Sequence, residues 1–214
     1  METSQTTTID GDTVRCENGV YHSLDRPAII TRNGNERYFI YGIEIPKDVF
    51  IELTEDSRMD SGLAITDECT QTKYVLYKHG LVLVKNEQLG VVCKYTYNNY
   101  GNLHSFFDEP SFLKIGNNFQ YFKYHKDGVL HRIFGPAEKC RRHTAFYVNG
   151  KLHSQNDNPA LQEFDTVGRL IRETYYHEDV IHRDERPAVI SYDSFQNVIR
   201  EEFWKDGILI RADQ

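Results

Sequence analysis

The sequence predicts a mainly all-β protein, an antiparallel β-hairpin repeat meander that forms an elongated twisted sheet with one short helix. Two observations predict this class: a five-residue turn unit recurs along the chain, and aromatic residues precede most of these turns. The 14 Tyr and 12 Phe against 6 Pro also favour strands over helices. With 214 residues, the chain can bury a sizeable core in one domain or two.

The recurring turn unit has glycine at its second position in seven of eight copies and aspartate in the remaining copy, EDVIH. Asn-Gly and Asp-Gly favour hairpin turns because both central residues can adopt positive φ. The intervals between turns vary from 21 to 38 residues, so we expect hairpins with loops of different lengths rather than a rigid solenoid. The copies, in chain order, are NGVYH, YGIEI, HGLVL, YGNLH, DGVLH, NGKLH, EDVIH and DGILI.

Two columns of side chains precede the turns and face opposite sides of the predicted sheet. The first, four positions before the glycine, is aromatic in six of seven units and should be the packed face. The second column is mixed, which predicts a partly solvated surface where Tyr147, Tyr176 and Trp204 form an exposed partner-binding strip. The alternative is that loops of the same chain cover this face. The first column is Tyr38, Leu76, Tyr97, Tyr124, Phe146, Tyr175 and Phe203, and the second is Phe39, Tyr77, Asn98, His125, Tyr147, Tyr176 and Trp204.

A histidine, an acid and a Pro-Ala or Pro-Ser dipeptide follow the turn in four units. Proline cannot donate to a ladder, so we expect it to begin the next strand. A His and an acid repeated in four units predict a structural clasp of the local turn, because an active site needs only one copy. Acid/base or metal chemistry is the alternative for these pairs. The pairs are His22 with Asp25, His104 with Asp108, His153 with Asp157, and His182 with Glu185.

No cofactor or metal site is predicted. The four cysteines lie far apart without a C-x-x-C motif, and the histidines lack the short spacings of common metal motifs. Nucleotide-binding, hydrolase and zincin signatures do not occur in the sequence. We interpret the cysteines as thiols in a reducing cytoplasm, with Cys93 and Cys140 as structural thiols in strands.

Three segments carry a resemblance to a known family: KDGVLHRIFGPA, VNGKLHSQNDNPA and HEDVIHRDERPAVI. They resemble degenerate HRxDGPA-type repeats, which are MORN-like and occur in proteins of bacteriophages and large DNA viruses. The resemblance covers residues 18–45 and about 74–214, although only Gly135 matches the family's glycine before proline. It implies a hairpin-repeat fold and a viral or phage accessory protein, and it implies no enzymatic activity.

One short helix is predicted near residues 46–53, in a segment similar to the capping end of that family's arrays. Pro46 suits the first turn of a helix, and Val49, Phe50 and Leu53 give the helix one apolar side. The chain then divides into four parts. These are a loose N-terminus at 1–17, an N-terminal repeat with capping helix at 18–58, a linker or insertion at 59–73, and the main β-hairpin repeat array at 74–214.

The charge and the hydropathy pattern exclude some partners. A formal charge of −7 opposes the electrostatic attraction that dominates nucleic-acid binding, so no nucleic-acid partner is expected. No apolar run approaches the roughly 20 residues that a membrane span needs. The opening METSQTTT lacks the basic and apolar regions of a secretory signal, which favours a cytoplasmic location.

The sequence therefore favours a non-catalytic β-repeat platform that binds a protein partner through an extended surface. The alternative is an enzyme with a single site in a groove between repeats near His131, where Phe134 replaces the repeated acid. A second alternative is association with a membrane surface, as in some MORN-type proteins, which the acidic charge weakens. An open meander also has edge strands, so a homodimer through them is a further option.

Overall fold

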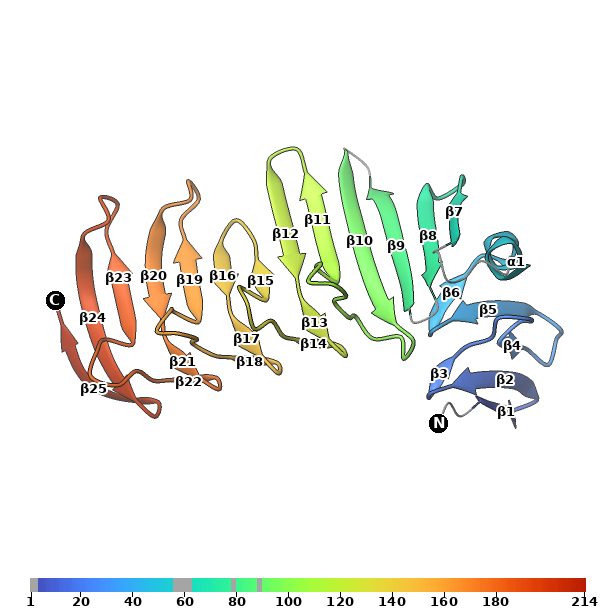
Figure 1. The fold of residues 1–214 in the computed structure, drawn as a ribbon, viewed down its shortest axis with the longest axis horizontal. Coiled ribbons are helices and arrows are strands. Elements are labelled where there is room, and N and C mark those ends of the chain that lie inside the picture. The colour runs from blue at the N-terminus through green and yellow to red at the C-terminus, as the bar shows by residue number, and fades with distance from the viewer. Residues whose placement is uncertain (1–3, 56–62, 78–79, 88–89) are drawn as a thin grey trace. The chain divides into compact units, whose positions relative to one another are not determined.

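The computed structural model describes residues 4–55, 63–77, 80–87 and 90–214, which form two compact units, 1–106 and 107–214 (Figure 1). Antiparallel strands dominate both units, which confirms the predicted all-β meander. The predicted short helix is also present, as α1 (Lys47–Glu55). Within the described part of the chain, no helix has the length and apolar character needed to cross a membrane.

The first unit combines a small sheet, the helix α1 and a meander. Its strands are β1 (Ser4–Ile9), β2 (Asp12–Glu17), β3 (Val20–Tyr21), β4 (Ile29–Ile30), β5 (Glu36–Ile40), β6 (Ile43–Ile45), β7 (Leu63–Asp67), β8 (Thr72–Tyr77), β9 (Gly80–Glu87) and β10 (Val91–Asn98). The small sheet has the order β1-β2-β4-β5-β6, with β3 paired to β2, and the meander runs β7-β8-β9-β10. Most consecutive strands are therefore neighbours, as hairpin connections require, and β4 pairs with β2 rather than with β3.

Helix α1 packs its apolar side into the core of the first unit. The amide of Phe50 donates to the carbonyl of Pro46 at 2.8 Å, so the first helical turn begins at the proline, as the sequence predicts. Val49, Phe50 and Leu53 are buried, and the ring of Phe50 lies 4.8 Å from that of Tyr38. The helix thus contributes these three side chains to the apolar cluster that the strands form.

The N-terminal segment forms a hairpin, whereas the sequence predicts a loose terminus at 1–17. Strand β1 pairs antiparallel with β2 from Ser4 opposite Glu17 to Ile9 opposite Asp12. The turn between them is Asp10-Gly11, and both residues have positive φ, 50° and 86°. The β-branched residues of TTTI favour strand and the turn has ordinary hairpin chemistry, so this prediction was wrong.

The segment predicted as a linker or insertion at 59–73 also forms strand where it is described. Strands β7 and β8 pair antiparallel, and residues 59–62 lie outside the described residues. The connecting turn is organised by Asp67, whose Oδ1 accepts the amides of Cys69 and Thr70 at 2.9 and 3.3 Å. An aspartate that caps its own turn is a local signal for a hairpin.

The second unit is a repeated meander with a short hairpin attached to each inner repeat. Its strands are β11 (Phe112–Gly116), β12 (Phe119–Lys123), β13 (His125–Lys126), β14 (Val129–Leu130), β15 (Glu138–Lys139), β16 (His143–Ala145), β17 (Tyr147–Val148), β18 (Lys151–Leu152), β19 (Leu161–Phe164), β20 (Leu170–Thr174), β21 (Tyr176–His177), β22 (Val180–Ile181), β23 (Val189–Tyr192), β24 (Val198–Lys205) and β25 (Ile208–Asp213). The sheet runs β11-β12-β15-β16-β19-β20-β23-β24-β25, and β13–β14, β17–β18 and β21–β22 are the short hairpins.

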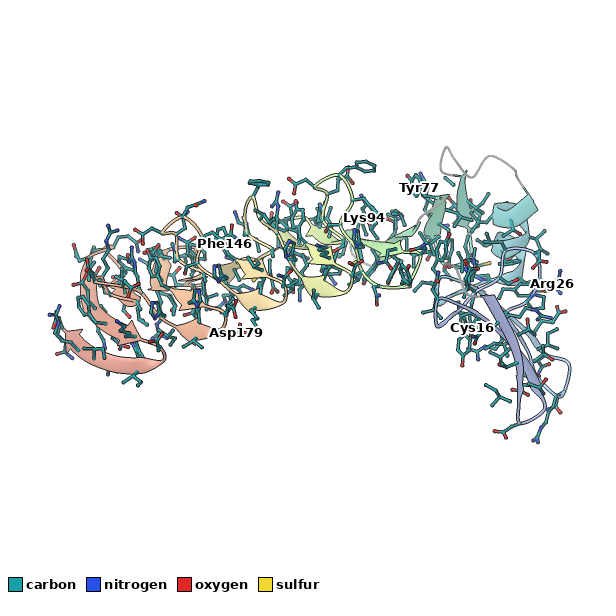
Figure 2. The ribbon with its side chains drawn as sticks, turned by 60° about the horizontal axis from the view of Figure 1, so that its bottom comes forward. Cys16, Arg26, Tyr77, Lys94, Phe146 and Asp179 are labelled. Carbon is teal, nitrogen blue, oxygen red and sulfur yellow. The ribbon has the colours of Figure 1, made fainter. Side chains whose placement is uncertain are left out.

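The turns of the short hairpins are hydrogen-bonded to one another. Amides at the glycine position of one turn donate to the carbonyl that ends the preceding hairpin: Gly150 to Leu130, Asp179 to Leu152 and Gly207 to Ile181, at 2.8, 2.9 and 3.0 Å. We call this row of contacts the turn ladder. Figure 2 marks Asp179, the one departure from glycine, whose Oδ1 also accepts the Leu152 amide at 2.7 Å. This extra bond favours the aspartate at a position with φ of 70°.

The first aromatic column is packed only in part. Tyr38, Tyr124 and Tyr175 are buried, and so is Leu76, the non-aromatic member. Phe146 and Phe203 are half-buried. The column residue sits beside a fully buried alanine of the Pro-Ala dipeptide, because the amides of Tyr124, Phe146 and Tyr175 donate to the carbonyls of Ala137, Ala160 and Ala188 at 2.7 to 2.8 Å.

The second column contains two polar residues, Asn98 and His125, which the sequence suggests as signs of a wet surface. Both are buried in the structure. The Oδ1 atom of Asn98 accepts the amides of Tyr100 and Asn102, each at 3.0 Å, and Nδ1 of His125 lies 2.8 Å from Oγ of Ser111. Hydrogen bonds therefore compensate for their burial, and the inference of a wet surface from these two residues was wrong.

Candidate functional site

Tyr147, Tyr176 and Trp204 hold the same position in successive repeats of the second unit, and each is half-buried. Their carbonyls accept the amides of Arg132, Ser154 and Arg183, at 3.0, 2.8 and 3.2 Å. Each of these donors belongs to the preceding repeat, so neighbouring repeats hold the backbone of all three residues. We call these three side chains the aromatic strip.

The aromatic strip has a regular spacing and polar tips. Neighbouring strands lie about 4.7 to 4.9 Å apart, so positions separated by two strands follow one another at about 10 Å. Burial raises the pKa of Tyr147 and of Tyr176, so both phenols stay protonated at neutral pH and can donate. The indole Nε1 of Trp204 donates to Glu202 at 2.8 Å, which fixes the orientation of the ring.

The repeated histidines bind the turn of the next repeat. Nδ1 of His22 accepts the amide of Tyr41 at 3.0 Å, and Nδ1 of His182 accepts the amide of Asp206 at 3.1 Å. His131, which the sequence excludes from the repeated pairs, makes the same contact with the amide of Asn149 at 3.0 Å. A nitrogen that accepts an amide hydrogen carries no proton, so the contact with Asn149 selects the neutral imidazole of His131, whose pKa burial lowers.

The repeated acids Asp108 and Asp157 pair with arginines of the following repeat. Arg132 donates to both carboxylate oxygens of Asp108 at 3.0 and 2.9 Å, and Arg183 donates two bonds to Asp157 at 3.0 and 2.8 Å. Among the described residues, no hydrogen bond or ion pair joins His153 to Asp157. The acid thus joins neighbouring repeats through an arginine that directly follows a histidine.

These arginines also stack on the first aromatic column. The guanidinium carbon of Arg132 lies 3.8 Å from the ring centre of Tyr124, and that of Arg183 lies 3.6 Å from the ring centre of Tyr175. Cation–π stacking and a bidentate carboxylate pair are geometries that suit arginine better than lysine. This role of the arginines was not predicted, although the His-Arg dipeptides at 131–132 and 182–183 are its signal in the sequence.

The other members of the predicted clasp have separate partners. Asp25 accepts a hydrogen bond from Oγ of Ser23 at 2.9 Å and pairs with Arg26. The ring of His104 packs on Phe106, and that of His153 lies 5.1 Å from the ring of His177. Glu185 lies in the loop before Pro187 with a φ of 58°, and among the described residues no hydrogen bond or ion pair joins it to His182.

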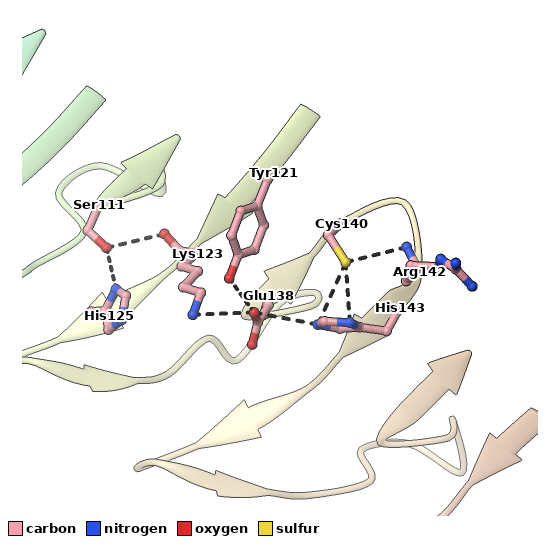
Figure 3. Close-up of polar contacts among 8 residues, drawn as sticks. All are labelled: Ser111, Tyr121, Lys123, His125, Glu138, Cys140, Arg142 and His143. Carbon is pink, nitrogen blue, oxygen red and sulfur yellow. Dashed lines mark hydrogen bonds and ion pairs between the residues drawn. The ribbon is translucent and has the colours of Figure 1, made fainter. Parts of the chain in front are cut away.

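A buried carboxylate, Glu138 of β15, contacts polar side chains from the two neighbouring strands, β12 and β16 (Figure 3). The hydroxyl of Tyr121 donates to Oε1 of Glu138 at 2.6 Å, Nζ of Lys123 lies 3.3 Å from that oxygen, and Nε2 of His143 lies 3.5 Å from it. We call these four residues the Glu138 cluster. Glu138 follows Pro-Ala directly, a position that is Ile29, Phe112, Leu161 or Val189 in other repeats.

The carboxylate of Glu138 is ionised at neutral pH. Burial alone would raise the pKa of Glu138, but the Tyr121 hydrogen bond and the charges of Lys123 and His143 outweigh it, and the pKa lies below its usual value. Burial, with the bond to Glu138, raises the pKa of Tyr121. The carboxylate is therefore neutralised inside the cluster, which makes the cluster a satisfied polar insert in the sheet.

Cys140 lies beside this cluster, directly after β15. Its Sγ atom is 3.2 Å from Nδ1 and 4.0 Å from Nε2 of His143, so the sulfur faces the imidazole ring. The amide of Arg142 donates to the sulfur at 3.4 Å. Cys140 is half-buried and lies outside the strand, unlike Cys93, which is buried within β10 as predicted.

Metal binding and known relatives give no further guide to function. In residues 4–55, 63–77, 80–87 and 90–214, no group of three or more His, Cys, Asp or Glu is arranged to hold a metal ion. Comparison with protein-family models and with curated proteins gives no match for the chain.

Acid is expected to destabilise the second unit through His131. Burial and the nearby charge of Lys126 lower the pKa of His131 from 6.5, so the unfolded chain binds protons more readily than the folded one. The free energy of unfolding should therefore fall as the pH drops below about 6.5. Urea unfolding between about pH 7.5 and pH 5.5 tests this. His131→Gln should reduce the pH dependence, and His125, whose pKa burial also lowers, should account for part of what remains; an unchanged slope would contradict the assignment.

Proposed function

We propose that this protein is a non-catalytic β-repeat platform that binds a protein partner through the aromatic strip of Tyr147, Tyr176 and Trp204. The observation that carries the proposal is that three half-buried aromatic side chains occur once per repeat on a backbone held by neighbouring repeats. By the resemblance of its repeats, the platform belongs to a viral or phage accessory protein.

The chemistry of the strip fits a protein surface. Tyr and Trp are enriched among the residues that dominate binding energy, because each combines a large apolar area with a hydrogen-bonding tip. The hydrogen-bonded backbone also lowers the entropy lost on binding. These features favour a partner that offers apolar groups and hydrogen-bond acceptors at intervals of about 10 Å.

The catalytic alternative near His131 would draw on Glu138, Cys140 and His143, which follow His131 in the sequence. The carboxylate of Glu138 is already paired by Tyr121 and Lys123, and the sulfur of Cys140 faces the ring of His143 rather than one nitrogen. His131 itself holds the turn at Asn149. These engaged groups support the binding platform over the enzyme.

The proposal is tested by partner capture with matched variants. A tagged wild-type protein should retain a partner from native cells, and a Tyr147→Ser, Tyr176→Ser double variant should bind that partner at least about 30-fold more weakly, as loss of a hot spot predicts. The control is Tyr77→Ser, which removes a 44% exposed tyrosine of the same column in the first unit. Capture that survives the double variant, or fails equally with the control, would contradict the proposal.

Trp204 is the only tryptophan of the chain and reports directly on the strip. Addition of the captured partner should change the emission of Trp204 as the ring loses its remaining exposure to water. An unchanged spectrum in a saturated complex would place the partner elsewhere on the molecule.

A further inference from the structure

Strand β25 lies where, in an inner repeat, the first strand of the next repeat lies. In an inner repeat, Thr174 of β20 lies opposite Val189 of β23, the first strand of the following repeat. At the corresponding place in the last repeat, Glu202 of β24 lies opposite Ala212 of β25. Strand β25 therefore takes the place of a first strand, although it reaches that place directly from the last turn.

The outer edge of such a first strand normally accepts another antiparallel strand. Strand β23 pairs with β20 on one side and with β24 on the other. Strand β25 pairs with β24, and no other strand of the described residues pairs with it. The outer edge of β25 therefore corresponds to the edge of β23 that pairs with β24.

The first half of this outer strand is apolar and exposed, and its two charged residues, Arg211 and Asp213, pair with each other at 3.1 Å. Ile208, Leu209 and Ile210 are consecutive and 66%, 44% and 65% exposed, and the strand contains no lysine or proline. Natural edge strands are commonly blocked by charge, proline or a cover, because an open apolar edge pairs with other chains. A bulge at Ile210 lies between β24 and β25. The interior strands β20 and β24 carry the same kind of register shift and still pair on their other side, beyond the bulge, over residues 172–174 and 201–205.

We propose that β25 pairs antiparallel with β25 of a second copy of this chain, and that the sheet of the second unit continues into that copy. A two-fold axis perpendicular to the sheet makes two identical edge strands antiparallel. Neighbouring strands of the inner repeats have the same orientation. A pairing over the whole strand sets Ile208 of each copy opposite Asp213 of the other and Ile210 opposite Arg211. No like charges then meet across the interface.

The pairing is tested by the mass of the protein in solution. Light scattering or sedimentation over a wide concentration range should show a reversible dimer. Ile210→Lys should raise the dissociation constant at least about tenfold, because both copies then carry a new charge at the edge. The control is Val167→Lys, which adds the same charge at a 69% exposed turn residue. A monomer at every concentration, or a dimer unaffected by Ile210→Lys, would overturn the proposal.

Hydrogen exchange gives an independent measurement on the unaltered chain. The outward-facing amides of β25 should exchange more slowly at high protein concentration than at low concentration, while amides of the turn at Val167 should not change. Equal exchange of β25 at both concentrations in a dimeric sample would overturn the proposal. The Tyr147→Ser, Tyr176→Ser variant should dimerise normally, which separates this interface from the aromatic strip.

Discussion

Leu53→Ala is expected to lower the free energy of unfolding of the first unit by about 3 to 4 kcal/mol. Leu53 is 0% exposed and packs within the apolar cluster that α1 shares with β5 and the meander. Truncation would leave a cavity between the helix and the strands, since a close-packed core relaxes only in part. Chemical denaturation of the first unit, followed by circular dichroism, measures the loss.

Ile51 provides the matched control on the same helix. It is 39% exposed, so Ile51→Ala should change the free energy of unfolding by less than about 1 kcal/mol. Equal losses for the two variants would contradict the burial of Leu53 as the source of the effect, since alanine has a higher helix propensity than either residue that it replaces.

Arg183→Ala is expected to lower the free energy of unfolding of the second unit by about 2 to 3 kcal/mol. Its side chain is 12% exposed, stacks on Tyr175, pairs with Asp157, and donates to the carbonyl of Pro187 at 3.1 Å. Loss of the guanidinium removes all of these contacts and exposes the face of Tyr175. Thermal or urea unfolding of the variant measures the change.

Two further variants separate position from charge at this contact. Arg186 pairs with the same Asp157 but is 62% exposed, so Arg186→Ala should have an effect below about 0.5 kcal/mol. Arg183→Lys keeps the charge but lacks the planar fork, and should recover only part of the lost stability. Full recovery by lysine would assign the effect to charge alone.

Much of the fold could be predicted because its signals are local. A hairpin turn such as Asn149-Gly150 depends on the two residues that adopt positive φ, 52° and 82°, and α1 depends on Pro46 and the apolar spacing that follows it. The N-terminal hairpin was missed although Asp10-Gly11 has the same chemistry, because its strands carry threonine in place of the aromatic pair.

The contacts between repeats could not be predicted because their partners are distant in sequence. Asp108 lies closer in the chain to His104 than to Arg132, yet its carboxylate pairs with the arginine 24 residues away. His125 similarly finds its partner in Ser111, which is 14 residues distant. The recurrence of a polar residue is visible in the sequence. The register of the sheet determines which side chain that residue contacts.

The Glu138 cluster illustrates the same difficulty for the candidate site. Its sequence signal is an acid at a position that is apolar in other repeats, and this departure is visible without a structure. The neighbours of that acid depend on the pairing of β12 with β15, which sets Lys123 opposite Glu138. The aromatic strip depends only on repeat position, so it could be named from the sequence.

The turn ladder has a consequence for how such a chain can change in evolution. Each of its bonds joins a turn only to the turn before it, as from Gly207 to Ile181 and from Asp179 to Leu152. A gene segment that encodes one whole repeat can therefore be duplicated or lost while each junction keeps its donor and acceptor. Selection can then adjust the length of the array, and with it the width of the sheet, without redesign of a core.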